Sequence, residues 1–320
     1  MKVSRRKLLD ESQSTGFRPE ILEKVIQLLN LLNGFNSHPF LKDKLVLKGG
    51  TALNLFLFDL PRLSVDIDLN YIGAVDRQTM MEERPKVEQA VQAVCLREGM
   101  SIVRAPNDYA GGKWRLRYDS SIGEGGNLEV DLNFMFRLPL WSTVKMDAIV
   151  GNYSAEQIRV LDIHELAAGK LAALFARHAS RDLFDSHYLL THSKLDREKL
   201  RLGFVLYGAM NRKDWRAVNV EDITFNKSEL KNQLLPVVRR QFIKNEMFTD
   251  WAKQMIQQSK DLMGVILPLH KNEAAFLDAI LDDGKIKPEL LTCDSTMIER
   301  ITNHPLLQWK AFNVKQHKNK

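Results

Sequence analysis

The sequence predicts an α+β protein in which a mixed β-sheet flanked by helices is followed by a C-terminal helical bundle. Between residues 45 and 136, short segments that alternate apolar and polar residues are separated by apolar helical stretches. From about Leu195 the chain changes to amphipathic helices joined by polar linkers. We therefore divide the 320 residues into a domain at residues 1–192, with the sheet behind an N-terminal helix, and a helical domain at residues 193–320.

The composition is that of an ordinary globular protein, with an apolar fraction of 44%. No run of about 18 apolar residues, the length of a membrane-spanning helix, is present. The N-terminus lacks the apolar stretch of a signal peptide, so we expect a cytoplasmic protein. The net charge of +6 is compatible with a polyanionic partner but is also common among proteins that bind none. Cys95 and Cys293 show no metal-binding spacing, and we expect both to be buried.

Six segments are expected between residues 1 and 71. Residues 1–16 are polar and basic and should form a loose lead-in. Apolar residues between Ile21 and Leu32 predict a helix that packs on the sheet and ends near Asn33–Gly34. A strand at residues 45–48, a glycine turn and an apolar helical stretch come next. A second strand then runs from Ser64 to Tyr71.

Further along, a helix is expected at residues 80–99, followed by a strand from Ser101. Residues 113–119 and 127–136 should form a hairpin around a glycine-rich turn, with its charged side chains pointing outward. Asp162 should cap a helix that runs to His178. In the C-terminal half we expect amphipathic helices at residues 237–242, 251–263 and 273–281.

Asp66 and Asp68 point to a metal site. Strand geometry places both carboxylates on one face, about 7 Å apart, while Ile67 points into a core. Carboxylates this close repel each other and need a compensating cation, and carboxylate oxygen is the preferred ligand of hard divalent ions. We therefore expect two Mg²⁺ or Mn²⁺ ions. Ser64, one alternation earlier, either touches a phosphate or makes room for one.

The glycine turn fits the same chemistry. Gly49 and Gly50 let the backbone approach a ligand closely. The amides of Gly50, Thr51 and Ala52 open a helix N-terminus, where phosphate is stabilised. A phosphate cradle and a carboxylate pair in strand–helix–strand order indicate phosphoryl or nucleotidyl transfer, with a nucleoside triphosphate as co-substrate.

The segments Lys48 to Leu53 and Arg62 to Leu69 resemble the signature of the polymerase-beta-type nucleotidyltransferases. In this form the string is similar to that of the AbiEii/AbiGii toxin family, which includes the MenT toxins, and the likeness is close over residues 21–190. The resemblance implies the polymerase-beta-type fold and the toxin of a phage-defence toxin–antitoxin system. It further implies a separately encoded antitoxin as partner and transfer of nucleotides to the 3′ end of tRNA, which blocks translation.

The family pattern has a third acidic residue on a strand after the two aspartates, and Asp131 occupies that position. An additional carboxylate can bind the metal that activates the attacking hydroxyl and can accept its proton. We expect Asp66, Asp68 and Asp131 to hold the metals. Glu129 faces the same way as Asp131 and is the alternative.

Lys170 lies with Arg177 on an otherwise apolar helical face, where a lysine either reaches water or meets an anion. The resemblance implies that Lys170 holds the triphosphate and acts in catalysis, and that Asp182 or Asp185 supports the site. Arg177 and Arg181 fit a structural or a functional role equally. The predicted nucleotide-binding residues are Lys48, Gly49, Gly50, Thr51, Ser64, Lys170, Arg177, Asp182 and Asp185.

Two other functions are compatible with this sequence. One is a nucleotidyltransferase that modifies a protein or a small molecule, which only the surroundings of the cleft would distinguish. The other is a non-catalytic nucleotide-binding module. A non-catalytic module has no evident reason to keep clustered carboxylates, so we favour an enzyme.

Overall fold

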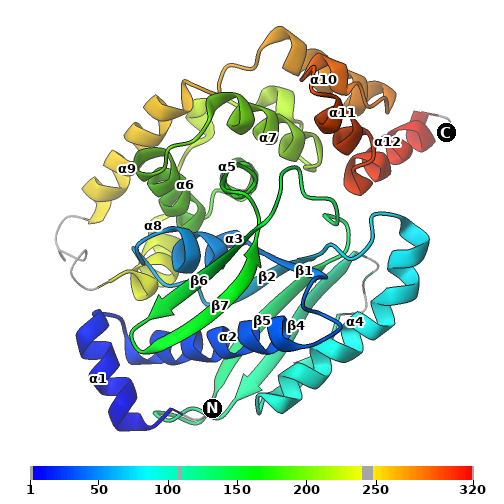
Figure 1. The fold of residues 1–320 in the computed structure, drawn as a ribbon. Coiled ribbons are helices and arrows are strands. Elements are labelled where there is room, and N and C mark those ends of the chain that lie inside the picture. The colour runs from blue at the N-terminus through cyan, green and yellow to red at the C-terminus, as the bar shows by residue number, and fades with distance from the viewer. Residues whose placement is uncertain (1–2, 107, 109, 240–247, 319–320) are drawn as a thin grey trace. The chain divides into compact units, whose positions relative to one another are not determined.

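The computed structural model describes residues 3–106, 108, 110–239 and 248–318 (Figure 1). The chain divides into two compact units. The first unit comprises Met1–Arg137, Ser142–Leu161 and Leu234–Asn245, and the second comprises Leu138–Trp141, Asp162–Gln233 and Glu246–Lys320. This division groups the helices between Asp162 and His192 with the C-terminal helices, whereas the boundary at residue 192 stays a prediction.

A seven-stranded mixed sheet forms the centre of the first unit, which confirms the α+β prediction. Its strand order is β3-β4-β5-β2-β1-β7-β6. The pairs β1–β7 and β2–β5 are parallel, and the other neighbours are antiparallel. The strands are β1 (Leu45–Lys48), β2 (Asp66–Tyr71), β3 (Ser101–Arg104), β4 (Gly111–Tyr118), β5 (Gly126–Asn133), β6 (Val144–Val150) and β7 (Tyr153–Val160).

Two long helices, α2 (Pro19–Ser37) and α4 (Arg77–Arg97), lie along the sheet (Figure 1). Leu47, Leu69 and Ile158 come together beneath α2. Because side chains alternate along a strand, the burial of Ile67 and Leu69 turns Asp66 and Asp68 to the opposite face. The helix-covered face is thus the core, and the other face carries the carboxylates.

The expectation of a loose lead-in at residues 1–16 is wrong, because α1 (Arg5–Thr15) forms there. The Ser4 side chain accepts a hydrogen bond from the amide of Lys7, and Gly16 ends the helix in the left-handed conformation. Leu8 is fully buried. Burial of Leu8 and the caps at both ends therefore stabilise a helix that the polar composition of this segment did not predict.

The helix α2 also differs from its expected end, since it continues past Gly34 to Ser37. A Cβ atom at Gly34 would lie 2.7 Å from Cγ1 of Val94 on α4. The glycine therefore permits close packing of two helices rather than stopping one.

The hairpin formed by β6 and β7 was not expected from the sequence. Cys95 is buried as expected, but Cys293 is exposed.

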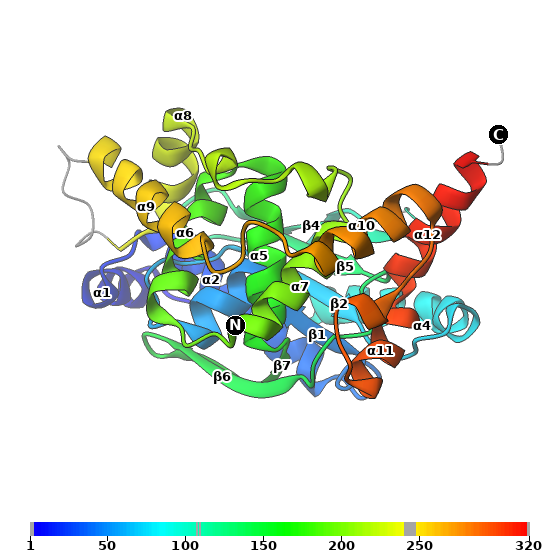
Figure 2. The same ribbon diagram turned by 90° about the horizontal axis from the view of Figure 1, so that it is seen from above.

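The second unit is helical. Its longer helices are α5 (Ile163–Arg177), α6 (Ser180–His192), α7 (Arg197–Ala209), α9 (Phe248–Met263), α10 (Lys271–Asp283), α11 (Ser295–Thr302) and α12 (Pro305–Lys318). Phe175, Phe204 and Trp215 pack with ring centroids 5.1–6.1 Å apart. Figure 2 shows α10, α11 and α12 grouped together.

Asp162 caps α5 as expected, and α9 and α10 match two of the three predicted amphipathic helices. Residues 240–242 of the third lie outside the described residues. Among the described helices, none combines the length and hydrophobicity required to cross a lipid bilayer.

Glu165 on α5 anchors residues 138–141 within the second unit. Its carboxylate accepts hydrogen bonds from the Leu140 amide at 2.9 Å and the Tyr207 hydroxyl at 3.1 Å. The side chain is almost fully buried, and this burial raises the pKa of Glu165 to about 7. The anchor therefore titrates near neutral pH.

This raised pKa makes stability depend on pH. The contribution of Glu165 is fully present below its unfolded pKa of 4.5 and is lost as the pH rises through 7. We expect the free energy of unfolding of the wild type to fall by up to about 3 kcal/mol over this range, and Glu165→Gln to lack this fall. Denaturant titrations at several pH values measure this change in the free energy of unfolding.

Replacing the exposed Glu198 on α7 by glutamine is the matched control, and it should keep the wild-type pH dependence. If Glu165→Gln showed the same fall in stability as the wild type, the titration of this buried carboxylate would not be its source.

Candidate active site

A row of four charged residues crosses the face of the sheet opposite α2. The strand register pairs Lys48 on β1 with Asp68 on β2, Asp68 with Asp131 on β5, and Asp131 with Lys113 on β4. Directly paired residues share a face, so two carboxylates stand side by side between two lysines. Asp66 lies on the same face, one alternation earlier on β2.

The electrostatics of Asp131 follow from this row. Burial raises the pKa of Asp131 above its usual range. Lys48 and Lys113 lower it, whereas Asp68 and Glu129 raise it further. The net upward shift therefore comes from burial, because the two lysines lower the pKa of Asp131 at least as much as the two neighbouring carboxylates raise it.

Glu129, the alternative to Asp131, is engaged elsewhere. Its carboxylate forms ion pairs with Lys113 at 2.8 Å and Arg115 at 3.3 Å. It stands directly opposite Asp66 in the register. The geometry therefore favours Asp131 over Glu129 as the third carboxylate.

The glycine turn meets β2 at the carboxylates. Gly49 has a positive φ of 72°, and a Cβ atom there would collide with the Asp68 carboxylate. The Thr51 hydroxyl donates to the backbone carbonyl of Asp66, and the Asn54 amide donates to the carbonyl of Gly50 at 3.0 Å. Turn and strand are thereby fixed together, and the buried Thr51 side chain serves this internal contact.

The short helix α3 (Gly49–Thr51) continues into a π-helix at Ala52–Leu57, so the turn opens a helical segment as expected. Ser64 is buried just before β2. The ammonium of Lys48 lies 5.3 Å from the ring centroid of Phe136. These contacts hold the residues around the turn in place.

The carboxylate face has the chemistry of a divalent-metal site. Carboxylate oxygens suit Mg²⁺, and Asp66, Asp68 and Asp131 place three carboxylates on this face. The buried Asn70 Oδ1, on the same face, has no hydrogen-bond partner within the described part of the chain. Among these residues, no three His, Cys, Asp or Glu side chains converge closely enough to enclose an ion. The oxygen atoms on this face are of the kind that binds Mg²⁺, but the side chains do not converge around a single point.

The other predicted residues form a cluster within the second unit. The Lys170 ammonium contacts Asp182 at 2.9 Å and Asp185 at 3.0 Å, and Arg177 contacts Asp182 at 2.5 Å. Burial alone would raise the pKa of Asp182, but Lys170 and Arg177 hold it well below its usual range. Both aspartates therefore fix Lys170, and Asp182 also binds Arg177.

Lys113 is a neighbour of the carboxylates that the sequence analysis did not assign to the site. Its pKa is raised chiefly by its hydrogen bond to Glu129 and also by the charges of Asp66 and Asp131. The sequence held a usable signal, because the hairpin turn pairs Tyr118 with Gly126. Counting back along both strands from that pair places Lys113 opposite Asp131.

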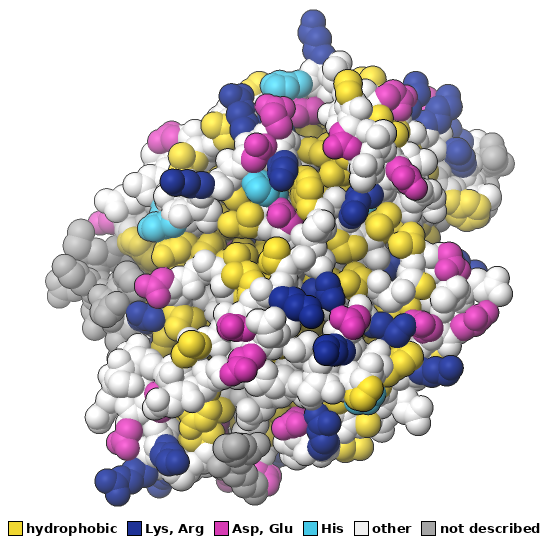
Figure 3. All heavy atoms as spheres, viewed as in Figure 1, with side chains coloured by type: hydrophobic (Ala, Val, Ile, Leu, Met, Phe, Trp, Pro, Cys, Tyr) yellow, Lys and Arg dark blue, Asp and Glu magenta, His cyan; other side chains and the backbone are white. Residues whose placement is uncertain are grey.

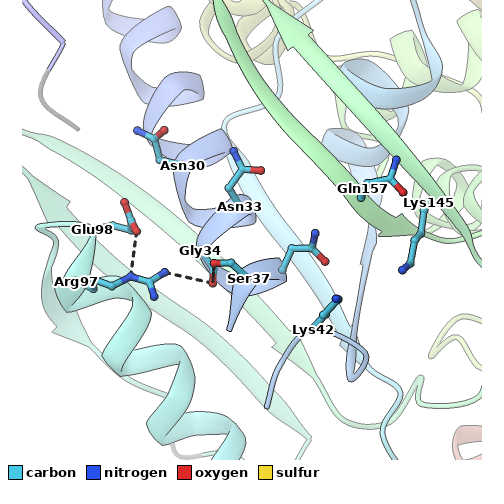
Figure 4. A pocket seen from close by; sticks show the side chains of 10 residues that line it. Asn30, Asn33, Gly34, Ser37, Lys42, Arg97, Glu98, Lys145 and Gln157 are labelled. Carbon is cyan, nitrogen blue, oxygen red and sulfur yellow. Dashed lines mark hydrogen bonds and ion pairs between the residues drawn. The ribbon is translucent and has the colours of Figure 1, made fainter. Parts of the chain in front are cut away.

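A pocket of about 720 Å³ lies on the helix-covered side of the first unit and is separate from the carboxylates (Figure 4). It is lined by the end of α2, by Arg97 and Glu98 at the end of α4, and by Lys145 and Gln157 from β6 and β7. Arg97 donates to the carbonyl of Gly34 and pairs with Glu98, both at 3.4 Å. These contacts satisfy helix C-termini, so the pocket has a structural explanation.

One solved structure similar to this chain is MenT4, a nucleotidyltransferase toxin from Mycobacterium tuberculosis H37Rv. The match has a TM-score of 0.63 and 17% sequence identity, and it covers 96% of this chain and 99% of that one. This likeness confirms the fold. A comparison with curated protein sequences gave no match.

The family model described as nucleotidyl transferase AbiEii toxin, Type IV TA system, matches residues 30–280. The match spans most of the chain and includes the glycine turn, the aspartates of β2 and β5, and the Lys170 cluster. The chain therefore belongs to the AbiEii family of nucleotidyltransferase toxins.

Proposed function

We propose that this chain is a metal-dependent toxin that transfers nucleotides from a nucleoside triphosphate to the 3′ end of tRNA and so blocks translation. The observation that carries the proposal is the Asp68–Asp131 pair, which lies against a glycine turn that admits no Cβ atom at Gly49. Carboxylates beside a close-approach backbone turn suit a triphosphate with its counter-ions.

Each residue has a defined part in this proposal. Two divalent ions held by Asp66, Asp68 and Asp131 would neutralise charge on the phosphates and lower the pKa of the attacking hydroxyl. The amides after Gly49 bind phosphate oxygens. Asp131, which stands beside Asp68 in the register, is the proposed acceptor for the hydroxyl proton. Lys48, at the end of the row, attracts the triphosphate.

The remaining parts of the proposal rest on the family. Lys170, buried and oriented by Asp182 and Asp185, holds the triphosphate, and Arg177 orients Asp182. The toxin acts in the cytoplasm, is restrained by a cognate antitoxin protein and serves in phage defence.

The carboxylates provide the first test. We expect Asp68→Asn and Asp131→Asn each to lower the transfer rate more than about a hundredfold, since loss of a second-shell partner alone costs up to that much. Each change removes repulsion, so the free energy of unfolding without metal should stay equal or rise slightly. Single-turnover transfer and denaturant titration measure the two effects.

Glu129→Gln is the matched control, because Glu129 shares the face but is held by Lys113 and Arg115. It should lower the rate less than about tenfold, as expected for a surface ion pair. If Asp131→Asn were as active as Glu129→Gln, the third carboxylate would be wrongly assigned.

Lys170 provides a second test. Lys170→Met leaves Asp182 and Asp185 without their shared cation, so the free energy of unfolding should fall by about 3 kcal/mol. Adding Asp185→Asn should recover part of this loss. Calorimetric titration on the folded variants should show triphosphate affinity reduced about tenfold, the value of one charge-assisted hydrogen bond.

The exposed Lys194, replaced by methionine, is the control for both measurements. Unchanged stability in Lys170→Met would contradict the buried cluster, and unchanged triphosphate affinity would remove Lys170 from the nucleotide site.

The acceptor is tested directly. Incubation with each labelled nucleoside triphosphate, Mg²⁺ and either total RNA or total protein should place label on the 3′ end of tRNA. Label on protein or on a small molecule instead would refute the tRNA proposal while keeping the transferase. Asp68→Asn, run in parallel, shows that any labelling comes from this chain.

A further inference from the structure

Net charge identifies no binding surface on this protein. On the face shown in Figure 3, Lys and Arg side chains are interspersed with Asp and Glu. A local concentration of positive charge instead follows from the strand register. We define the basic band as Lys113, Arg115 and Arg117 of β4 together with Arg104 of β3.

The band continues the face that carries the carboxylates. Lys113, Arg115 and Arg117 are exposed and alternate with buried residues of β4. Lys113 stands opposite Asp131, and Arg115 stands opposite Glu129. The band therefore begins at the candidate active site and leads away from it along β4, within a single unit of the structure.

Positive charge in the band exceeds what its neighbours compensate. Arg104 lies directly opposite Arg115 across the β3–β4 pair, and like charges in that arrangement destabilise a sheet. Glu129 pairs with Lys113 and Arg115. Arg104 and Arg117 have no carboxylate partner among the described residues, although the Arg117 guanidinium donates to the backbone carbonyl of Glu124 at 3.5 Å. Charge on an edge strand such as β3 can prevent mispairing. That role does not require a second arginine opposite the first.

The spacing of the band matches a repeating anion. Alternate residues on a strand are about 7 Å apart, so β4 presents three cations at regular intervals. An extended nucleic-acid strand presents phosphates in a similar repeat. Trp114 and Tyr118 point into the core, so β4 offers no aromatic side chain for base stacking on this face. Such a surface binds phosphates rather than bases.

We infer that the basic band binds the phosphate backbone of a single-stranded nucleic-acid segment and directs its terminal hydroxyl toward Asp131. The inference rests on the proposed function for the identity of the reacting end. It assigns the positioning of the acceptor to four side chains, and it predicts a contact that does not depend on base sequence. An acidic protein segment is the competing occupant.

The experiment measures binding of a fluorescent single-stranded RNA in EDTA, over a series of salt concentrations. Arg104→Gln/Arg117→Gln should weaken binding about tenfold or more, and should reduce the slope of log K against log salt by about 0.7 per removed cation. Arg104→Lys/Arg117→Lys should keep most of the affinity and the slope. Thermal unfolding confirms that these exposed changes leave the fold intact.

Lys42→Gln/Lys145→Gln is the matched control, since it removes two exposed cations that line the pocket on the opposite side of the sheet. It should bind RNA as the wild type does. Equal weakening in the control, or an unchanged salt slope in the band variant, overturns the inference. So does preferential binding of an acidic peptide over RNA.

Binding in EDTA separates this inference from the proposed function. If RNA binds through the band but no nucleotide is transferred, the proposed function fails and the surface stands. If transfer proceeds with an unchanged KM for RNA in Arg104→Gln/Arg117→Gln, the band inference fails and the transferase stands.

Discussion

The side-by-side placement of two half-buried carboxylates, Asp68 and Asp131, is the constraint on which this face of the sheet depends. The two carboxylates occupy paired positions on the parallel strands β2 and β5, with a lysine beyond each of them. Burial raises the pKa of Asp131 despite the nearby lysines, so keeping this carboxylate charged costs free energy. A protein gains from this arrangement when it binds an ion and an anionic substrate together.

The rest of the first unit holds these carboxylates in position. Leu47 and Leu69 are buried beneath α2, which fixes the direction of the alternating side chains on β1 and β2. The hydrogen bond from Thr51 to the Asp66 carbonyl joins the glycine turn to β2, the strand that carries Asp66 and Asp68. Gly49 leaves room for the Asp68 carboxylate against the turn. Core packing and site geometry therefore depend on the same strands.

The cations of this chain serve different purposes according to burial. Lys170 is buried and held by two aspartates, so its position is fixed by the fold. Arg104 and Arg117 are exposed on the sheet, and Arg117 contacts only the backbone carbonyl of Glu124 among the hydrogen bonds of its side chain seen in the described residues, so a polyanion can reach both cations. Lys113 combines both properties. It is exposed, but its hydrogen bond to Glu129 and the charges of Asp66 and Asp131 raise its pKa.

The sequence by itself determined the strand at Asp66–Tyr71, the glycine turn, the Asp162 cap and the family, because these features depend on neighbouring residues. It did not reveal α1, whose single buried leucine is hidden in a polar segment, or the extension of α2 beyond Gly34, which depends on Val94 of another helix. Tertiary structure alone decided that Asp131 stands beside Asp68 while Glu129 is neutralised by basic residues. The reason is that alternation along a strand is a local property, whereas the register between strands is set by side-chain packing across distant parts of the chain.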